Sequence, residues 1–330
     1  MKIAIVGPGA VGSYYGAKLL RFGQEVHFLL RSDYDAVRKS GVRIISPEGN
    51  FSVRPRCAKT PEEIGVCDLV IISLKTVAND RFNELLPPLT GPQTALLTLQ
   101  NGLGNEEALS AIFGSDNVLG GLCFVCLNRL QPGVIEHLVH GKITLGEFNR
   151  WPEPRTHDLA TMFRNSGIPC AVTDNLARAR WEKLIWNIPF NGLGVASAAG
   201  LEAVMNGKLI PGRPWSAGLS TDLLLADAQW LQLIRDLMHE IKTTANALNL
   251  GISDSLPEEL ISLTRAMKAY KPSTLLDFEK KQPLELQSIF LTPLDIARRH
   301  HVSTPRLQRL CTVLEGINNS IEAQNALSNS

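Results

Sequence analysis

The 330-residue sequence lacks an excess of charge of either sign, since 33 Lys and Arg residues stand against 32 Asp and Glu residues, a formal net charge of +1. Nucleic-acid binders usually carry a clustered basic surface, so this balance argues against such a partner. The absence of an apolar run of about 18 residues excludes a membrane-spanning helix. The first residues, MKIAIVGPGAVG, lack the basic start, longer apolar core and cleavage site of a secretory signal. We therefore expect a cytoplasmic protein with small-molecule ligands, and we leave a homodimer open.

Cysteines are few and scattered, at positions 57, 67, 123, 126, 170 and 311. This pattern is typical of cytosolic thiols and not of a disulfide framework. Cys123 and Cys126 form a C-x-x-C, but strand periodicity would send the two side chains to opposite faces, and no second pair completes a zinc site. The seven histidines form no H-E-x-x-H motif, and the adjacent His300 and His301 suit surface solvation. No metal is predicted.

The length exceeds what a single core usually supports, so we expect two domains. The first half alternates short β-branched runs with segments of helical spacing, which predicts a Rossmann-type, doubly wound and mainly parallel sheet. Helices are expected over 10–23, before Pro87-Pro88 and over 155–166. The expected strands are 2–6, 25–30, 68–74, 94–99, 118–127, 133–139, 142–148 and 168–173.

From Asn175 onward the apolar spacing becomes helical, which predicts an all-helical domain over 175–330 after an N-terminal domain over 1–174. Segment 206–218, NGKLIPGRPWSAG, is rich in Gly and Pro and is predicted to be a loop. The helical windows are 175–190, 222–250, 256–270, 274–299 and 304–324.

A glycine-rich turn, Gly7-Pro8-Gly9-Ala10-Val11-Gly12, stands directly between the first expected strand and helix. Gly7 permits the tight turn, Gly9 lets the backbone approach a pyrophosphate, and Gly12 allows close packing of helix on strand. The phosphates would then lie at the helix N-terminus. Any tight strand-to-helix turn favours glycine, but this context predicts a dinucleotide site over 7–12.

The end of the second strand distinguishes NADP from NAD. NAD sites usually place an acid there for the ribose 2′-hydroxyl, whereas this sequence has Arg31. A guanidinium can form a charge-assisted pair with a 2′-phosphate, so NADP is the expected cofactor. The alternative is a solvated arginine at a strand end.

Two further strand ends point at the same crevice, because ligands of open α/β sheets lie beyond the carboxyl ends of the strands. Lys75 follows the strand at 68–74, and Asn101, within Gln100-Asn101-Gly102, follows the strand at 94–99. Both are predicted to face the cofactor. Either residue could instead be an ordinary loop residue.

A polar stripe follows the helix expected to begin near residue 175. Lys183, Asn187 and Asn191 are spaced i, i+4 and i+8, so they share one face. Ammonium and amide groups can bind a carboxylate and hydroxyls, and Lys183 can protonate an alkoxide. Such a stripe is often a solvated face, but its strongly apolar flanks, including Trp181 and Phe190, indicate a buried helix whose polar groups need partners.

In this order the segments resemble the ketopantoate reductase (2-dehydropantoate 2-reductase) family over nearly the whole chain. The residues that carry the resemblance are GPGAVG at 7–12, Arg31, SLKT at 73–76, QNGLGN at 100–105, WEKLIWNIPFN at 181–191 and PSTLLDFEKKQPLEL at 272–286.

The resemblance implies a role for each matching residue. Lys183 would be the proton donor, and Glu285, near the nicotinamide and the substrate, would join it as the second catalytic residue. Asn187, Asn191 and Ser273 would contact substrate, and Asn101 would lie near both ligands. The adenosine phosphate end of NADP would be held by Arg31 and Lys75.

The sequence departs from the family pattern at a few positions. Leu284 stands where the family commonly has Thr, and Thr292 where it has Gly. The run after Asn191 is longer than in close members, and Asn206 falls where the alignment is loose. These departures bear on the substrate and leave the hydride chemistry intact.

We therefore expect NADPH-dependent reduction of 2-dehydropantoate to pantoate, a step of pantothenate biosynthesis, in a cleft between the two domains. The enzymatic alternatives are reduction of another branched or aromatic 2-keto acid, or an opine-type dehydrogenase. A sensor that binds NADP without turnover is the alternative of another class, but it has no need of Lys183 and Glu285 together.

Overall fold

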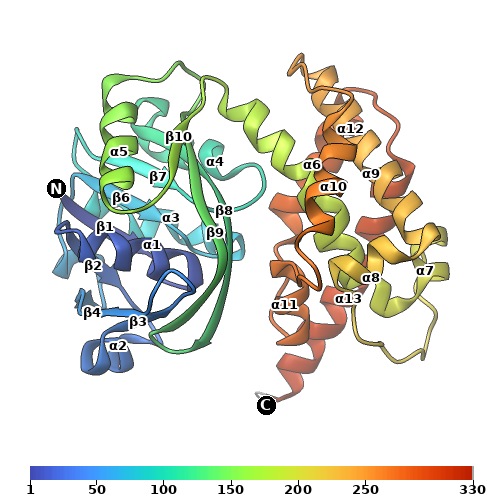
Figure 1. The fold of residues 1–330 in the computed structure, drawn as a ribbon, viewed down its shortest axis with the longest axis horizontal. Helices are drawn as coiled ribbons and strands as arrows, with labels where there is room; N and C mark the ends of the chain where they lie inside the picture. Colours follow the sequence, from blue (N-terminus) through green and yellow to red (C-terminus); the bar gives the residue numbers. More distant parts are fainter. Residues whose placement is uncertain (329–330) are drawn as a thin grey trace. The chain divides into compact units, whose positions relative to one another are not determined.

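The computed structural model describes residues 1–328 and divides into two compact units, Met1–Leu176 and Ala177–Ser330 (Figure 1). Within the described part of the chain, every strand belongs to the first unit and the second is helical. The division falls at the start of helix α6 (Leu176–Ala196), whereas the sequence places it after residue 174.

The first unit is built on a ten-stranded sheet in the order β4-β3-β9-β8-β7-β6-β1-β2-β5, with β10 paired to β9. The strands from β5 through β2, β1, β6 and β7 to β8 pair in parallel. The strands are β1 (Lys2–Val6), β2 (Glu25–Leu29), β3 (Val42–Ile45), β4 (Phe51–Val53), β5 (Arg56–Ala58), β6 (Leu69–Ile72), β7 (Ala95–Thr98), β8 (Val118–Gln131), β9 (Val134–Glu147) and β10 (Cys170–Val172).

Helices cover both faces of this sheet, which explains why β6 and β7 are apolar and buried at every position. On one face α1 (Ala10–Arg21) and α5 (Pro154–Asn165) pack into a core that includes Tyr15 and Phe163. On the other face lie α3 (Phe82–Leu85) and α4 (Asn105–Phe113), with Phe82 and Leu109 in the core. The doubly wound Rossmann-type fold predicted from the sequence is confirmed.

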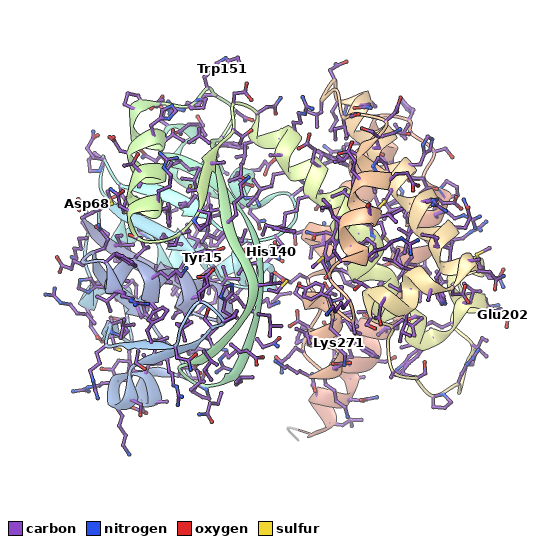
Figure 2. The ribbon with its side chains drawn as sticks, in the orientation of Figure 1. Tyr15, Asp68, His140, Trp151, Glu202 and Lys271 are labelled. Atoms are coloured by element: carbon purple, nitrogen blue, oxygen red, sulfur yellow. The ribbon has the colours of Figure 1, made fainter. Side chains whose placement is uncertain are left out.

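The sheet is mainly parallel, as predicted, and within the described residues only the pairs β8–β9 and β3–β4 are antiparallel. One detail of the predicted sheet is wrong. The expected strands 133–139 and 142–148 are a single 14-residue strand, β9. His140 and Gly141 interrupt the pairing with positive φ angles of 69° and 137°, but they form a bulge and not a turn, so the strand continues. Figure 2 labels His140 on β9 and Tyr15 on α1, whose hydroxyl donates to the Gly141 carbonyl at 3.4 Å.

Two stretches of the first unit differ from the sequence pattern. Residues 31–67, for which no element is predicted, contain β3, β4, β5 and α2 (Tyr34–Ser40). The helix expected before Pro87-Pro88 is mostly 3-10 turns, Thr76–Arg81 and Pro87–Leu89, around the four-residue α3. Ala78 leaves helical geometry, so a longer helix cannot form.

The second unit is helical, as predicted, but several helices are shorter than the expected windows. Window 222–250 divides where Asp227 caps α9, and window 256–270 ends its helix at Arg265. Window 274–299 is interrupted between α11 and a π-helical segment, Gln287–Leu291. No described helix is both long and apolar enough to cross a bilayer. The helices are α6, α7 (Leu201–Asn206), α8 (Thr221–Ala226), α9 (Ala228–Ala247), α10 (Leu256–Arg265), α11 (Ser273–Glu279), α12 (Thr292–Arg299) and α13 (Pro305–Ser328).

The predicted loop 206–218 follows α7 and returns to the end of α6. The Ser216 N–H donates to the Ala198 carbonyl at 3.0 Å, and the Leu219 N–H to the Gly194 carbonyl at 3.1 Å. A Cβ at Gly218 would collide with the same Gly194 carbonyl. The glycine therefore lets the loop close against α6.

Candidate functional site

The turn between β1 and α1 depends on glycine at two positions. Gly7 has a φ of +80°, and a Cβ there would lie 2.7 Å from the backbone N of Leu74. A Cβ at Gly12 would lie 2.9 Å from Ile5 Cγ2 and collide with the Ser73 hydroxyl. That hydroxyl donates to the Gly7 carbonyl at 2.8 Å and so joins the ends of β1 and β6.

Gly9 has no such structural requirement, because an added Cβ would meet only the Gly7 carbonyl oxygen, at 4.0 Å. It is the N-cap of α1, and no side chain caps the helix. The open space beside Gly9 fits a pyrophosphate, which the helix dipole and N–H groups would attract. Ser13 steadies the turn by donating to the Pro8 carbonyl at 2.7 Å. The predicted dinucleotide residues thus form a turn, Gly7 to Gly9, and the first helical residues, Ala10 to Gly12.

The end of β2 carries the predicted Arg31, whose side chain is exposed. An acid does follow it, since Asp33 lies two residues on and is buried. Arg129 of β8 takes both carboxylate oxygens of Asp33, at 2.6 Å from Nη2 and 3.1 Å from Nε. Asp33 is therefore neutralised by Arg129 and leaves Arg31 available for a 2′-phosphate.

Sequence reasoning missed a second basic feature near the end of β2. The Lys59 ammonium lies 4.6 Å from the Tyr34 ring centroid, and the Arg38 guanidinium lies 5.8 Å from it. Arg38 also donates to the Tyr34 hydroxyl at 3.4 Å. The helical spacing of Tyr34 and Arg38 could have signalled this contact, whereas Lys59 comes from a separate segment.

A network of amides fixes the loops after β6 and β7. The Gln100 amide donates to the Leu74 carbonyl at 3.0 Å and to Asn79 Oδ1 at 2.7 Å. Asn79 in turn donates to Asn105 Oδ1 at 2.9 Å, and Asn105 donates to the Asn101 carbonyl at 3.0 Å. Loop 100–105 is thereby fastened to the segment that follows β6.

The two predicted cofactor residues of these loops lie at the carboxyl ends of adjacent strands. Lys75 is exposed and begins the turn after β6, and Asn101 is half-buried after β7. The two strands pair in parallel, so their ends share one edge of the sheet. The next residue, Gly102, has a φ of +83°, which suits glycine and lets the chain bend away after Asn101.

In the second unit, α6 carries the predicted polar stripe. Asn191, 3% exposed, accepts a hydrogen bond from the Thr274 N–H at 3.0 Å and from the Ser273 hydroxyl at 3.4 Å. Two predicted substrate residues, Asn191 and Ser273, are thus in direct contact. Because Thr274 lies at the start of α11, the contact also fixes α11 against α6.

Asn187, one turn earlier on α6, is 6% exposed and forms no side-chain hydrogen bond within the described part of the chain. Its amide atoms are not enclosed, because the one buried side-chain polar atom without a partner among the described residues is the Tyr14 hydroxyl, so the Asn187 amide is open to solvent or a ligand. Lys183, one further turn back, is half-buried. The stripe therefore combines the hydrogen-bonded amide of Asn191, the open amide of Asn187 and the ammonium of Lys183.

Glu285 lies between α11 and the π-helical segment and is 5% exposed. The chain there is anchored to α13, because the Leu284 N–H donates to Asn318 Oδ1 at 2.9 Å. A π-helical turn is an uncommon conformation that often accompanies functional sites. The loosely aligned Asn206 ends α7 and is exposed.

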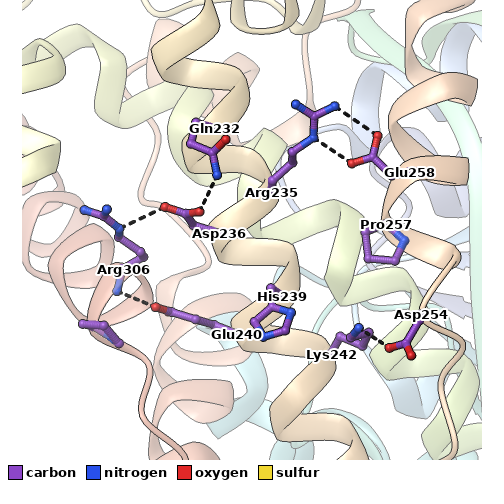
Figure 3. Close-up of a pocket in the computed structure, with 11 residues that line it drawn as sticks. Gln232, Arg235, Asp236, His239, Glu240, Lys242, Asp254, Pro257, Glu258 and Arg306 are labelled. Carbon is purple, nitrogen blue, oxygen red and sulfur yellow. Dashed lines mark hydrogen bonds and ion pairs between the residues drawn. The ribbon is translucent and has the colours of Figure 1, made fainter.

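A cavity of about 470 Å³ lies elsewhere in the second unit, among α9, α10 and the start of α13, and none of the predicted site residues lines it (Figure 3). Its basic side chains are paired with acids: Arg235 with Glu258 at 2.7 Å, Arg306 with Asp236 at 3.2 Å, and Lys242 with Asp254. These partners hold the pKa values of the Glu258 and Asp254 carboxyls below their usual range.

Glu240, in the wall of the same cavity, caps α13. Its carboxylate accepts from the N–H groups of Arg306 and Leu307, both at 2.9 Å. Burial nevertheless raises the pKa of Glu240. The cavity is therefore walled by internal ion pairs and a helix cap, with four carboxylates against three Lys and Arg side chains, each of which is already paired with an acid.

The six cysteines all lie in the described part of the chain. All six cysteines are free, and Cys123 and Cys126 are both buried. Cys123 packs in the core beside α1, and burial raises the pKa of the nearby Cys170 thiol to about 12. Among residues 1–328, no three His, Cys, Asp or Glu side chains are grouped to hold a metal ion.

Comparison with known proteins gives two matches to family models. Residues 3–150 match the family described as ketopantoate reductase PanE/ApbA, and residues 216–318 match its C-terminal model. The chain is 37% identical over 320 residues to a 2-dehydropantoate 2-reductase of Nostoc sp. (strain PCC 7120), covering 94% of this chain and 92% of that protein.

Solved structures of 2-dehydropantoate 2-reductases are also similar to this chain over nearly its whole length. The 2-dehydropantoate 2-reductase of Geobacter metallireducens GS-15 is 44% identical, with a TM-score of 0.86 over 96% of this chain and 99% of that one. The 2-dehydropantoate 2-reductase of Methylococcus capsulatus is 30% identical, with a TM-score of 0.85 over 97% and 98% of the two chains.

Proposed function

Since the chain belongs to the ketopantoate reductase PanE/ApbA family, we propose that it reduces 2-dehydropantoate to pantoate with NADPH, a step of pantothenate biosynthesis. Membership makes it a pyridine-nucleotide oxidoreductase. The first unit would hold the cofactor and the second the keto acid. A cytoplasmic location is proposed with this function, because six free thiols suit a reducing compartment.

The residues of the first unit suit NADPH. Its pyrophosphate would lie against the open space at Gly9 and the N-terminus of α1. Arg31, which follows β2, would pair with the 2′-phosphate, and Lys75 would assist at the same end. Asn101 would contact the cofactor beyond β7, and Glu285 would approach its nicotinamide. When bound, NADPH supplies the hydride.

Lys183 would protonate the ketone oxygen as it becomes an alkoxide. An ammonium held in a half-buried position can donate a proton to that oxygen and also stabilise its developing charge. Glu285, which is nearly buried, would orient the substrate or set the charge of Lys183. The two residues would thus act as the catalytic pair.

Asn187, Asn191 and Ser273, with Asn101, would bind the keto acid. The fixed pair of Asn191 and Ser273 offers a hydroxyl and an amide in set positions. The Asn187 amide makes no side-chain hydrogen bond among the described residues and is open to a ligand. The carboxylate and the terminal hydroxyl of 2-dehydropantoate could bind these groups. The stripe on α6, with one end fixed and its middle amide open, is the observation that carries this proposal.

The test is NADPH oxidation at 340 nm with a panel of 2-keto acids. A site built to hydrogen-bond a hydroxyl rejects an analogue that lacks it, by as much as ~10⁴-fold. We expect 2-dehydropantoate to exceed 2-ketoisovalerate by at least ~10²-fold in kcat/KM. A ratio near one would favour another branched or aromatic 2-keto acid. No oxidation with any compound would favour a sensor that binds NADP.

A further inference from the structure

Aromatic side chains adjoin the polar stripe of α6 on one side. Successive residues of an α-helix advance by about 100°, so Trp186 and Phe190 lie about 60° and 20° from Lys183 in one direction. Asn187 lies about 40° from Lys183 in the other direction. The sequence pattern accounts for Trp186 and Phe190 only as apolar flanks, and the reductase chemistry uses neither residue.

Helix α6 and segment 270–274 each contribute both to the polar stripe and to a group of aromatic side chains beside it. The Trp186 ring centroid lies 5.1 Å from that of Phe190 and 6.2 Å from that of Tyr270. Tyr270 comes three residues before Ser273, which meets Asn191 of α6. Segment 270–274 therefore runs beside α6 with Tyr270 next to the aromatic side chains and Ser273 next to the amides. We call Trp186, Phe190 and Tyr270 the aromatic wall.

Contacts outside the wall hold it in place. The Trp186 indole N–H donates to Thr264 Oγ1 of α10 at 2.8 Å. The Tyr270 carbonyl accepts from the Thr221 N–H at 3.0 Å, and Lys271, labelled in Figure 2, pairs with Glu279 at 2.7 Å. The wall is a fixed surface and does not depend on a ligand for its orientation.

Burial distinguishes Trp186 from an ordinary core residue. Phe190 is fully buried and backs the wall, whereas Trp186 remains half-buried although its polar edge is already satisfied. Its remaining accessible surface is therefore apolar, and the indole lies on the opposite side of Lys183 from the open amide of Asn187. Apolar surface with a few polar groups beside it is the usual composition of a small-molecule site.

We propose that Trp186 determines substrate specificity by contacting the apolar substituent on carbon 3 of the 2-keto acid. The inference rests on the proposed function, in which Lys183, Asn187 and Asn191 bind the carboxylate, ketone and hydroxyl groups. With those groups held on the polar stripe, a branched carbon 3 lies against the indole. A keto acid with only a methyl group leaves the indole uncovered and gains nothing from it.

The test compares Trp186→Leu and Trp186→Phe with the wild-type protein on 2-dehydropantoate, 2-ketoisovalerate and pyruvate. One methylene in an apolar pocket changes kcat/KM by about 10- to 200-fold. Trp186→Leu should lower kcat/KM by about 10- to 200-fold for the two branched substrates. The kcat/KM for pyruvate should change by less than about threefold. Trp186→Phe, which keeps an aromatic face, should recover most of the loss. An equal loss for all three substrates overturns the proposal.

Two controls separate direct contact from general disturbance. Trp230→Leu makes the same substitution in α9, at a site 7% exposed and away from the stripe, and should leave the substrate ratios unchanged. Thr264→Val removes the hydrogen bond to the indole and keeps the ring, so the branched preference should persist. Unchanged ratios in Trp186→Leu, or shifted ratios in Trp230→Leu, contradict the role of Trp186.

A binding measurement keeps the outcome independent of turnover. In calorimetry with NADP present, the wild-type protein should bind 2-hydroxyisovalerate, which has a branched carbon 3 but no terminal hydroxyl, more tightly than lactate, and Trp186→Leu should lose most of that difference. If no keto acid is reduced but this pattern is seen, the reductase proposal fails and the role of Trp186 stands. A wild-type protein without preference for 2-hydroxyisovalerate overturns the role of Trp186, whatever its activity.

Discussion

Arg129 and Asp33 are 96 residues apart in the sequence, yet the guanidinium of Arg129 takes both oxygens of the Asp33 carboxylate. Because Asp33 lies two residues after Arg31, Arg129→Leu should leave a negative charge where a 2′-phosphate is expected. The ratio of kcat/KM for NADPH to that for NADH should fall by about tenfold, equivalent to ~1.4 kcal/mol. Steady-state kinetics with both cofactors measures the ratio. Combining Arg129→Leu with Asp33→Asn should restore it, and an unchanged ratio in the single variant would count against this role.

Arg31 itself should determine the use of NADPH. A lost charge-assisted pair is worth about 1.5–3 kcal/mol, or roughly 10- to 150-fold. Arg31→Ala should raise the KM for NADPH by a factor in this range and leave that for NADH nearly unchanged. Arg43→Ala, at an exposed position of β3, removes the same charge elsewhere and is the matched control. An equal effect on both cofactors would show that Arg31 is structural.

Gly9 and Gly12 should respond differently to alanine. Gly9→Ala adds a Cβ into open space, so the melting temperature should change little while the dissociation constant for NADPH rises. Gly12→Ala forces a Cβ against Ser73 and Ile5, and overpacking of this kind costs about 1–3 kcal/mol of stability. Thermal melting and fluorescence titration of NADPH measure the two effects. A large loss of stability in Gly9→Ala would show that its space is needed by the protein itself.

Lys183→Ala should cut kcat by roughly 10²–10⁴-fold, the usual contribution of a positioned acid. NADPH binding should persist, because the cofactor turn lies in the first unit. Lys208→Ala, an exposed lysine of the second unit, controls for the lost charge. A variant with lower melting temperature and nearly full turnover would show that Lys183 only holds its helix.

Glu240 should make stability depend on pH. Because burial raises its pKa in the folded protein, the folded chain binds the proton more tightly than the unfolded chain. Its contribution to the free energy of unfolding is therefore complete below the unfolded pKa and is lost as pH rises through the folded value. In urea denaturation, the wild-type protein should gain stability relative to Glu240→Gln as pH falls from about 7 to about 5. For Glu258, whose pKa is lowered in the folded protein, the sign is opposite and the pH range is lower: the wild-type protein should lose stability relative to Glu258→Gln as pH falls below about 5.

Features set by local spacing could be predicted from the sequence. The β1 to α1 turn, the burial of β6 and β7, and the polar stripe of α6 each follow from a period within one segment. The family resemblance added the more distant residues, Ser273 and Glu285. The contact of Ser273 with Asn191 agrees with the predicted substrate set, while the binding roles of these residues remain predictions.

Features that depend on contacts between distant segments could not be predicted. Nothing near Asp33 indicates that Arg129 will neutralise it, and nothing near Gln100 indicates its bonds to Leu74 and Asn79. The sequence pattern predicts two strands, 133–139 and 142–148, whereas pairing with β8 carries the single strand β9 through a bulge at His140 and Gly141. Tertiary pairing overrode the local signal in each case.

The position of β9 between β8 and β3 governs when the sheet can be completed. Ser46, just after β3, contacts His137 of β9 across 91 residues of sequence, and β3 and β9 pair in parallel. During synthesis the pairing of β1, β2 and β6 is available long before β9 leaves the ribosome. The pair β3 and β4 must wait, as an isolated hairpin of marginal stability, until residues 134–136 of β9 have been added. Because such distant pairing slows folding, the early hairpin docks late on β9, and of the described strands only β10, which pairs with the same strand, joins the sheet from further along the chain.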